Sequence, residues 1–283
     1  MNKLLAAFAL VLVIFLAGCT SKVQQTAFGN GLEITYFNAP SAVDAGETFS
    51  VDLVVQNNGD SVASNVKAEL FQKSNFEIMD DVPTKEMSSL FPPVLEKNVP
   101  GEEFVTSWIV RAPSVALDQH KPLAARVTYD YTSTATSNIY TVPKEQYDEL
   151  GPESFNTYST SSRGPVLISI QPLPAFKIRQ GQDSVDALVV LTIENVGNGV
   201  VVGNLSNFHL LLTAENAVSN KTFTCSSVQE DREVQLLGPT QAITMKCAFD
   251  LSARNSAVSY IVDASADYTY YTDTEPLSIT VKK

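Results

Sequence analysis

The chain contains few of the residues on which most enzymes and metal proteins depend. Of its 283 residues, two are histidine, three are cysteine and one is tryptophan. His120 and His209 have no second histidine, cysteine or carboxylate at metal-ligand spacing, so the sequence predicts neither a transition-metal site nor a cofactor. A serine or cysteine triad would need one of these histidines as its base, and no Gly-x-Ser-x-Gly motif accompanies them. We therefore expect a protein that is not an enzyme.

Positive charge is also scarce. The chain has 19 lysine and arginine residues against 31 aspartate and glutamate residues, which gives a net charge of −12. Nucleic acid and anionic lipid headgroups are therefore not expected as partners, because an acidic surface repels both. Pairs of adjacent carboxylates begin at Asp80, Glu102 and Glu230, but none follows the pattern of a calcium-binding loop, and we expect them to be solvated. Weak binding of a divalent cation stays open.

Long apolar runs are missing too, except at the N-terminus. A basic head, Met1 to Lys3, precedes an apolar run from Leu4 to Phe15, and Leu16-Ala17-Gly18-Cys19 follows. The run is shorter than the roughly 20 apolar residues that a bilayer span needs, and this order of segments is typical of an export signal. An uncleaved transmembrane helix is the alternative. No second run resembles a span, so we expect the rest of the chain to lie outside the membrane.

The residues Leu16-Ala17-Gly18-Cys19 resemble the lipobox of prokaryotic lipoproteins at all four positions. The resemblance implies that residues 1–18 are a signal peptide and that Cys19 is acylated and becomes the new N-terminus. Residues 19–31 would then be a tether, with a reach of roughly 35 Å when extended. An ordinary signal peptide with a cysteine there by chance is the alternative. On the lipobox interpretation the protein is extracytoplasmic and anchored to the cell membrane by lipidated Cys19.

The two remaining cysteines, Cys225 and Cys247, form an even pair, which predicts a disulfide in an exported chain. Alternation puts Met245, Cys247 and Phe249 on one face of a strand, and Phe223 and Cys225 on a face that points into the same core. Because the two cysteines are close in sequence, we expect a bridge between neighbouring strands or across a corner. Two buried free thiols are the alternative.

Two triplets have the form of N-glycosylation acceptors. They are Asn204-Leu205-Ser206 and Asn220-Lys221-Thr222, and both fall in the C-terminal half of the chain. Such triplets also arise by chance, so Asn204 and Asn220 are candidate glycosylation sites only.

Short segments that alternate apolar and polar residues recur along the chain, and helix-period patterns are almost missing. Phe49, Val51, Leu53 and Val55 fall on one face, for example, with the period of two that is typical of a half-buried strand. Turn signals such as Asn57-Asn58-Gly59 separate these segments. The expected strands are 32–36, 49–55, 62–71, 104–110, 123–131, 138–142, 166–170, 185–194, 208–213, 221–225, 242–251 and 262–270.

This pattern divides the chain into two units. Residues 32–142 and 165–283 each hold about seven short strands, and a linker at 143–164 with Gly151-Pro152 and a run of serine and threonine joins them. The sequence allows one or two helical turns at 144–150. Short alternating strands at this spacing are typical of antiparallel sandwiches. The predicted fold class is therefore all-β, with two tandem immunoglobulin-like β-sandwiches after the signal and lipobox segment.

The second unit repeats the first. Residues 104–142 align with residues 243–281 without a gap, at a constant shift of 139. Tyr129 and Tyr131 then align with Tyr268 and Tyr270, and the turn at Asn57 aligns with a second turn further along the chain at a shift of 138. Because the four tyrosines alternate along their strands, we expect them to pack across the sheet rather than to stack on sugars.

The turns Asn57-Asn58-Gly59 and Asn195-Val196-Gly197, with Pro100-Gly101-Glu102 before the strand of Trp108, resemble the CARDB family. This is a group of immunoglobulin-like repeats of archaeal and bacterial surface proteins, including S-layer-associated ones. The resemblance implies sandwiches at a surface and carries no catalytic residues. The second unit departs from the pattern, because it lacks the Pro-Gly-Glu and has Cys247 at the position of Trp108.

These features lead to one functional expectation and one alternative. We expect a non-catalytic structural, adhesive or protein-binding role at the cell envelope, with an envelope protein or polysaccharide as partner. Rigid sandwiches on a lipid anchor would hold a binding surface away from the membrane. The alternative is an accessory or ligand-binding subunit of a membrane transport or secretion complex.

Overall fold

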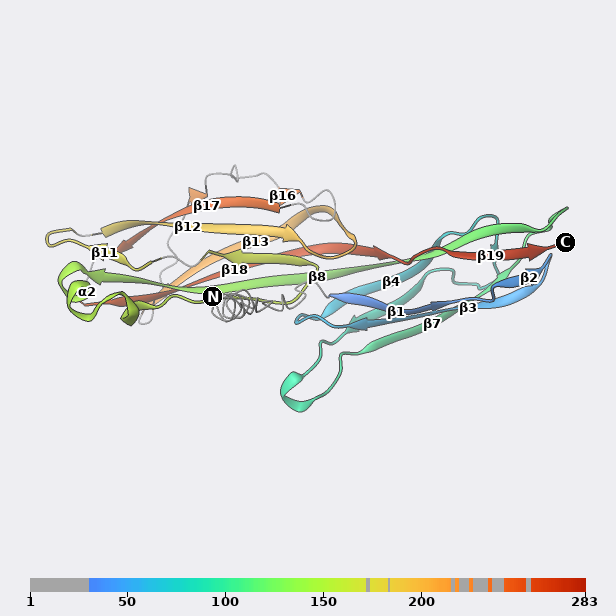
Figure 1. Ribbon diagram of the computed structural model, residues 1–283, viewed down its shortest axis with the longest axis horizontal. Coiled ribbons are helices and arrows are strands. Elements are labelled where there is room, and N and C mark those ends of the chain that lie inside the picture. Colours follow the sequence, from blue (N-terminus) through green and yellow to red (C-terminus); the bar gives the residue numbers. More distant parts are fainter. Residues whose placement is uncertain are drawn as a thin grey trace, which may run out of the picture.

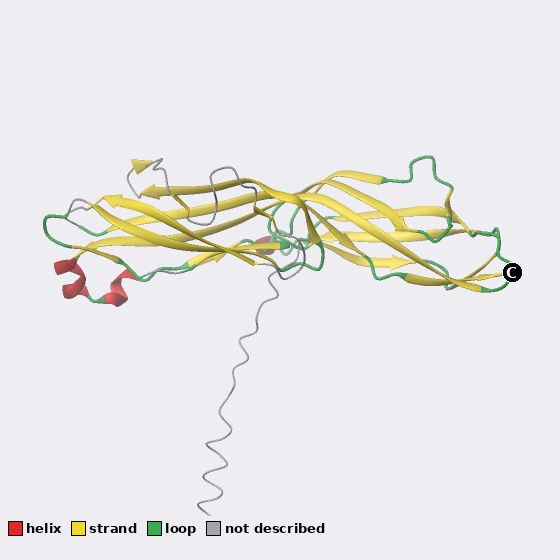
Figure 2. Cartoon of the chain, turned by 90° about the horizontal axis from the view of Figure 1, so that it is seen from above, coloured by secondary structure: helices red, strands yellow, loops and turns green. Residues whose placement is uncertain are grey.

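The computed structural model describes residues 31–171, 174–182, 184–214, 217–218, 224–225, 234–235, 242–252 and 256–283. Strands make up nearly all of its regular structure (Figures 1 and 2). The prediction of an all-β chain built as a sandwich is confirmed. The predicted lipidation site Cys19, the signal and most of the tether lie outside the described residues.

The elements before residue 144 are β1 (Leu32–Asn38), β2 (Ala42–Asp44), β3 (Thr48–Asn57), β4 (Ala63–Gln72), β5 (Glu77–Ile78), β6 (Lys85–Leu90), the short 3-10 helix η1 (Leu95–Lys97), β7 (Glu103–Arg111) and β8 (Gln119–Pro143). After them come α2 (Lys144–Leu150), η2 (Pro152–Phe155), β9 (Ser159–Ser161), β10 (Val166–Ile170), β11 (Phe176–Ile178), β12 (Ser184–Asn195), β13 (Val200–Ala214), β14 (Ala217–Val218), β15 (Thr224–Cys225), β16 (Val234–Gln235), β17 (Ala242–Ser252), β18 (Val258–Asp273) and β19 (Leu277–Lys282).

These strands form one long sheet and two short ones. The long sheet is built on β8 and β18, which pair antiparallel from Val258–Thr141 to Asp273–Arg126. One short sheet has the order β1-β3-β7-β5, and we call the end of the molecule that it covers the first half. The other has the order β10-β12-β17-β15 and covers the second half. Figure 1 shows the two short sheets at opposite ends of the long strands and on opposite sides of them.

Strand β8 runs through both halves, and the halves exchange their last strands. The C-terminal strand β19 returns to the first half, where it pairs with residues 119–123 of β8 and with β2. Residues 138–142 of β8, in turn, pair with the beginning of β18 and with β11 in the second half. The first half is therefore completed by β19, which comes from the second sequence repeat. The second half is completed by the end of β8, which comes from the first repeat.

The sequence prediction that residues 138–142 close the first unit was wrong, and so was the assignment of 277–282 to the second. Alternation marks 138–142 correctly as a strand, and 277–282 is a strand that was not among the expected ones. A period of two describes a strand's own faces and not its partners. The predicted break between residues 131 and 138 is also missing. The inward positions there are Ser133, Ala135 and Ser137, all buried, so the strand continues where the apolar signal fades.

The pairing of β8 with β18 has an approximate two-fold symmetry. Tyr129 pairs with Tyr270, and their counterparts at the shift of 139, Tyr268 and Tyr131, pair with each other. Asp130 pairs with its own counterpart, Thr269, and this pair marks the centre. In Figure 1 a half-turn in the plane of the picture brings β12 and β17 near the positions of β3 and β7.

One apolar core continues through both halves. Trp108 and Leu53 are fully buried in the first half, Phe249 and Leu191 in the second, and the paired tyrosines lie between them. Because the core has no break at the centre, the halves are not separate globules on a flexible hinge.

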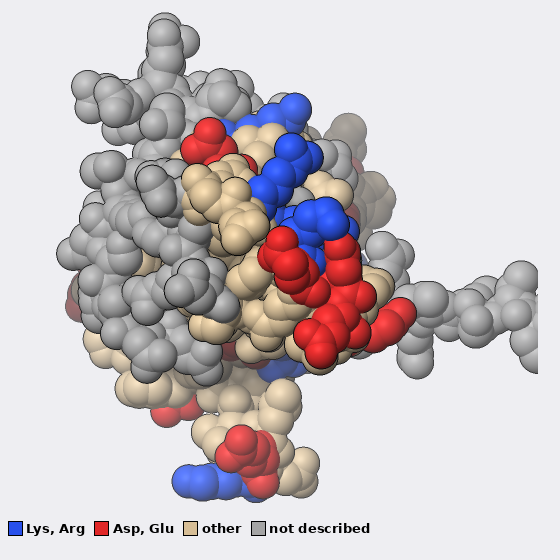
Figure 3. Space-filling model, turned by 90° about the vertical axis from the view of Figure 1, so that its left-hand side faces the viewer, with Lys and Arg blue, Asp and Glu red and all other residues tan. Residues whose placement is uncertain are grey.

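The predicted linker is structured and follows β8. The predicted helical turns at 144–150 are confirmed as α2, which lies at the outer end of the second half, where acidic and basic side chains gather (Figure 3). Tyr147 stacks on Phe155 with 5.7 Å between ring centres, over a small cluster that contains Val142. Strand β9 then pairs with residues 135–137 of β8. The segment therefore returns along the second half instead of separating the two halves.

Candidate functional site

Four tyrosine rings meet where the halves join. Tyr129 contacts Tyr131 and Tyr270, with ring centres 6.0 and 5.8 Å apart, and Tyr268 contacts Tyr131 and Tyr270 at 6.2 and 6.4 Å. All four side chains are buried. The prediction that they pack across the sheet is confirmed. The rings are mutually tilted or edge-on, which is the favoured arrangement for aromatic pairs.

Each tyrosine hydroxyl accepts a hydrogen bond from the backbone where a short sheet begins or turns. The donors to Tyr129, Tyr131, Tyr268 and Tyr270 are, in that order, the N–H groups of Leu32 (3.3 Å), Ser61 (3.1 Å), Val166 (3.3 Å) and Gly199 (2.8 Å). The donors fall at matching places in the two halves, so the symmetry extends to the hydrogen bonds. Each short sheet is therefore fastened to the centre of the long sheet by two phenol groups.

Burial raises the pKa of all four hydroxyls, that of Tyr270 to about 12. The groups therefore stay protonated at neutral pH and can donate as well as accept. Tyr131 donates to the carbonyl of Arg163 (3.2 Å), and Tyr270 donates to Asn195 Oδ1 (3.0 Å). A phenol held neutral in this way is a structural link and a poor base at neutral pH.

The turns that carry the CARDB resemblance have a structural role beside this cluster. Asn57 is buried, and its Nδ2 donates to the carbonyls of Ser61 (2.9 Å) and Leu90 (2.8 Å) while its Oδ1 accepts from the N–H of Gly59 (3.1 Å). Asn195 repeats this arrangement. Its Nδ2 donates to the carbonyl of Gly199 (3.0 Å) and its Oδ1 accepts from Gly197 (3.2 Å). A buried asparagine thus holds each turn against the tyrosines.

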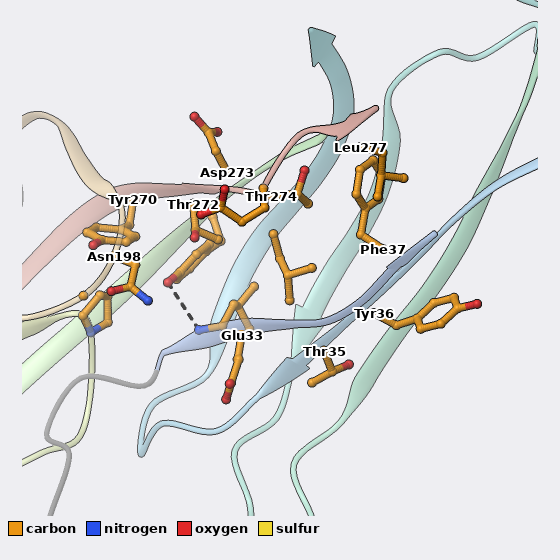
Figure 4. A pocket seen from close by; sticks show the side chains of 16 residues that line it. Glu33, Thr35, Tyr36, Phe37, Asn198, Tyr270, Thr272, Asp273, Thr274 and Leu277 are labelled. Atoms are coloured by element: carbon orange, nitrogen blue, oxygen red, sulfur yellow. Dashed lines mark hydrogen bonds between the residues drawn. The ribbon is translucent and has the colours of Figure 1, made fainter. Parts of the chain in front are cut away.

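A groove of about 770 Å³ opens beside the cluster, between β1 and the end of β18 (Figure 4). Tyr270 and Asn198 lie at one end of it, and Phe37 and Leu277 lie at the other. Among the described strands β1 pairs only with β3, so one edge of β1 borders the groove. An open groove along a strand edge suits contact with an extended chain better than it suits enclosure of a small molecule.

The outer face of β8 and β18 carries aspartates that bind threonines across the strand pair. Thr269 Oγ1 donates to Asp130 Oδ1 (2.6 Å), and Thr132 Oγ1 donates to Asp267 Oδ1 (2.7 Å). Further along, Thr136 donates in the same way to an aspartate of β18. Within the described residues no three histidine, cysteine, aspartate or glutamate side chains are grouped so that they could hold a metal ion. The aspartates therefore support the strand pairing.

The two cysteines of the predicted disulfide are direct partners across neighbouring strands. Cys225 of β15 pairs with Cys247 of β17, whose side chain is buried. The side chain of Cys225 lies outside the described residues. Directly opposed residues of an antiparallel pair have Cα atoms about 4.5 to 5.5 Å apart, which is within the range of a disulfide. In the pair of β12 and β17, Cys247 lies opposite Val189, and in the equivalent pair of β3 and β7, Trp108 lies opposite Val51. Cys247 therefore occupies the position of Trp108, as the repeat predicts.

Of the two candidate glycosylation sites and the two histidines, Asn204, His120 and His209 fall within the described residues. Asn204 lies on β13 at the pair with Gln235, its side chain is not among those described, and Asn220 falls wholly outside them. His120 lies in β8, and its Nδ1 is 3.1 Å from Thr280 Oγ1. His209 is exposed on β13.

A scan against protein-family models and a search of curated proteins find no match to this chain. The CARDB-like and lipobox interpretations therefore stay predictions. No helix within the described part of the chain has the length and apolar character needed to cross a bilayer.

Sequence reasoning missed two surface features. The junction groove depends on the strand exchange, which leaves no mark in a single strand's pattern. The other is a projecting loop at residues 91–100, which falls between the expected strands 62–71 and 104–110. Its signal was available as three prolines, Pro92, Pro93 and Pro100, around apolar residues that fit no strand or helix period.

Proposed function

We propose that this protein is an extracytoplasmic lipoprotein, anchored through acylated Cys19, with a non-catalytic structural, adhesive or protein-binding role at the cell envelope. Its halves act as CARDB-like, immunoglobulin-like sandwiches with an envelope protein or polysaccharide as partner. The observation that carries the proposal is the continuous strand β8. It passes through both halves and, with β18, makes them one stiff body.

Stiffness supports this role because a binding surface is most useful when its position is fixed. The strand exchange, the shared core and the tyrosine cluster remove the hinge that tandem domains usually have. A strand of 25 residues extends about 80 Å at the usual rise per residue. The protein is thus a rod that presents the junction groove and its strand edges in a constant geometry.

We also propose that Cys225 and Cys247 form a disulfide. Their register makes them direct partners, and the bridge would fasten the edge strand β15 to β17. A loop of this length contributes about 3 kcal/mol in the entropic account of disulfides. Asn204 and Asn220 stay candidates for glycosylation.

Intact-mass measurement of protein extracted from its native membranes tests the anchor and the bridge together. We expect a chain that begins at Cys19, carries acyl chains, and gains the mass of two hydrogens on reduction. A chain that begins at Met1, or an unmodified Cys19 in protein that does not sediment with membranes, contradicts the anchor.

Affinity capture from detergent-solubilised membranes tests the role. We expect the protein to be retained with envelope material and without a stoichiometric integral-membrane protein. A stoichiometric transporter or secretion component in the capture would support the accessory-subunit alternative instead.

A further inference from the structure

The loop at residues 91–100, between β6 and β7, presents apolar side chains to solvent. Phe91, Val94, Leu95 and Val99 are all exposed, and Leu95 most of all, at 70%. Figure 1 shows the loop, with η1 at its tip, projecting from the body near the middle of the long axis, and Figure 3 shows it as the lobe at the lower edge. Apolar side chains gathered at a projecting tip mark a contact surface.

Hydrogen bonds at the base and at the tip fix the shape of this loop. At the base, the N–H of Phe91 donates to Glu102 Oε2 (3.0 Å) and the N–H of Glu102 donates to the carbonyl of Phe91 (3.0 Å). A bridge between Val94 and Val99 closes the tip, with bonds of 3.0 and 3.1 Å in the two directions. The apolar side chains are thus held outward and do not fold back on the body.

The loop also has a fixed direction relative to the body. The N–H of Asn57 donates to the carbonyl of Glu102 (3.0 Å), and a Cβ added to Gly101 would lie 1.7 Å from the carbonyl oxygen of Asn57. Only glycine allows this approach, so the loop's base is packed directly against the end of β3.

The proposed tether ends beside the same place. The carbonyl of Gly31, the first described residue, accepts from the N–H of Asn58 (3.0 Å), and β1 begins immediately afterwards. In the short sheet β1, β3 and β7 are successive strands, so the tether's end and the loop's base are roughly 10 Å apart at the usual strand spacing. A tether of residues 19–31 would keep the loop within reach of the bilayer to which Cys19 would be attached.

We infer that the 91–100 loop inserts its apolar tip into the interface of that bilayer. This inference rests on the proposed lipid anchor. The chain as a whole carries a charge of −12, which opposes contact with anionic headgroups, but within the loop Glu96 and Lys97 cancel. A neutral apolar tip suits the boundary between headgroups and acyl chains. Because the loop leaves the body at mid-length, insertion would hold the long axis along the membrane surface.

Fluorescence of two single substitutions in the full lipidated protein tests this. Leu95→Trp places a reporter at the loop tip, and Leu117→Trp is the matched control, since Leu117 is 73% exposed in the connection between β7 and β8. Its neighbour Asp118 accepts a bond from the N–H of Lys283 (3.0 Å), beside the C-terminus at the outer end of the first half. The natural Trp108 is buried and common to both.

The proteins are reconstituted into phosphatidylcholine vesicles with or without lipids brominated in the upper acyl chain. Bromolipids should quench the added fluorescence of Leu95→Trp at least about twofold more strongly than that of Leu117→Trp, with a blue shift only for the former. Equal quenching in protein that floats with the vesicles overturns the loop inference and leaves the anchor intact. Protein with unmodified Cys19 that does not float overturns both. The emission of Leu95→Trp could also be blue-shifted in native membranes while bromolipids in the vesicles do not quench it. That result would indicate that the loop contacts a protein partner, and it would also overturn the inference.

Discussion

At the residue scale, the centre of the molecule depends on a few buried polar groups that each satisfy several partners. Ser133 Oγ donates to the carbonyl of Val166 (2.5 Å) and lies 2.8 Å from the hydroxyl of Tyr268, which accepts from the N–H of Val166. Such networks are specific because a lost member leaves its partners buried and unpaired.

Tyr268→Phe should therefore lower the free energy of unfolding by about 1 to 3 kcal/mol. The substitution keeps the ring contacts and removes only the hydroxyl that joins Val166 to Ser133. Urea unfolding followed by circular dichroism measures the change. Tyr271→Phe is the control, because the ring of Tyr271 lies under Arg126, 3.8 Å from its guanidinium carbon, and is half-buried. An equal loss in the two variants would contradict the role of the Tyr268 hydroxyl.

Alkaline pH should destabilise the protein through the same cluster. Burial raises the pKa of Tyr270 from 10.0 to about 12, so between these values the unfolded chain loses a proton that the folded chain keeps. The unfolded state then binds fewer protons, and the free energy of unfolding falls as pH rises above about 10. Tyr270→Phe should show a shallower fall from pH 10 to 12 in urea titrations at each pH. A variant as steep as the parent would show that Tyr270 is not a source of the dependence.

At the element scale, the sequence predicted most strands and missed how they associate. The alternation of Phe49 to Val55 predicts β3 well because one of its faces is fully buried. Segments 138–142 and 277–282 were placed in the wrong halves because a strand's own pattern does not identify its neighbour. The repeat held a partial clue. Asp130 and Thr269 are aligned by the shift of 139, and they are also partners in the strand pair. This coincidence can be recognised only once the pairing is known.

Ile279→Ala should loosen the first half, although residue 279 lies near the end of the chain. Ile279 is buried in β19, where it pairs with Lys121, and the truncation should cost about 2 to 5 kcal/mol. Hydrogen exchange should become faster in β2 and in residues 119–123 of β8 before it does in β12 or β17. Ser278→Ala, on the exposed face of the same strand, should change little. Faster exchange confined to β12 and β17 would contradict the strand exchange.

At the scale of the whole molecule, the shared strand β8 should make unfolding a single transition. Trp108 is the only tryptophan and lies in the first half, whereas Leu191 is buried in the second. Leu191→Ala should lower the unfolding midpoint reported by Trp108 fluorescence by the same amount as that reported by circular dichroism. Leu188→Ala, exposed on the same strand, is the control. An unchanged Trp108 midpoint would show that the halves unfold independently.

The reciprocal exchange of β19 and the end of β8 has a consequence for biogenesis. A nascent polypeptide usually completes its N-terminal domain while the ribosome is still extending the rest. Here the half that emerges first lacks β19, which is synthesised after the strands of the second half, so the first half cannot close until the chain has been made as far as residue 282. Termination of translation before β19 should thus leave β2 and residues 119–123 of β8 without their partner strand, and quality-control proteases would encounter an unfinished N-terminal half.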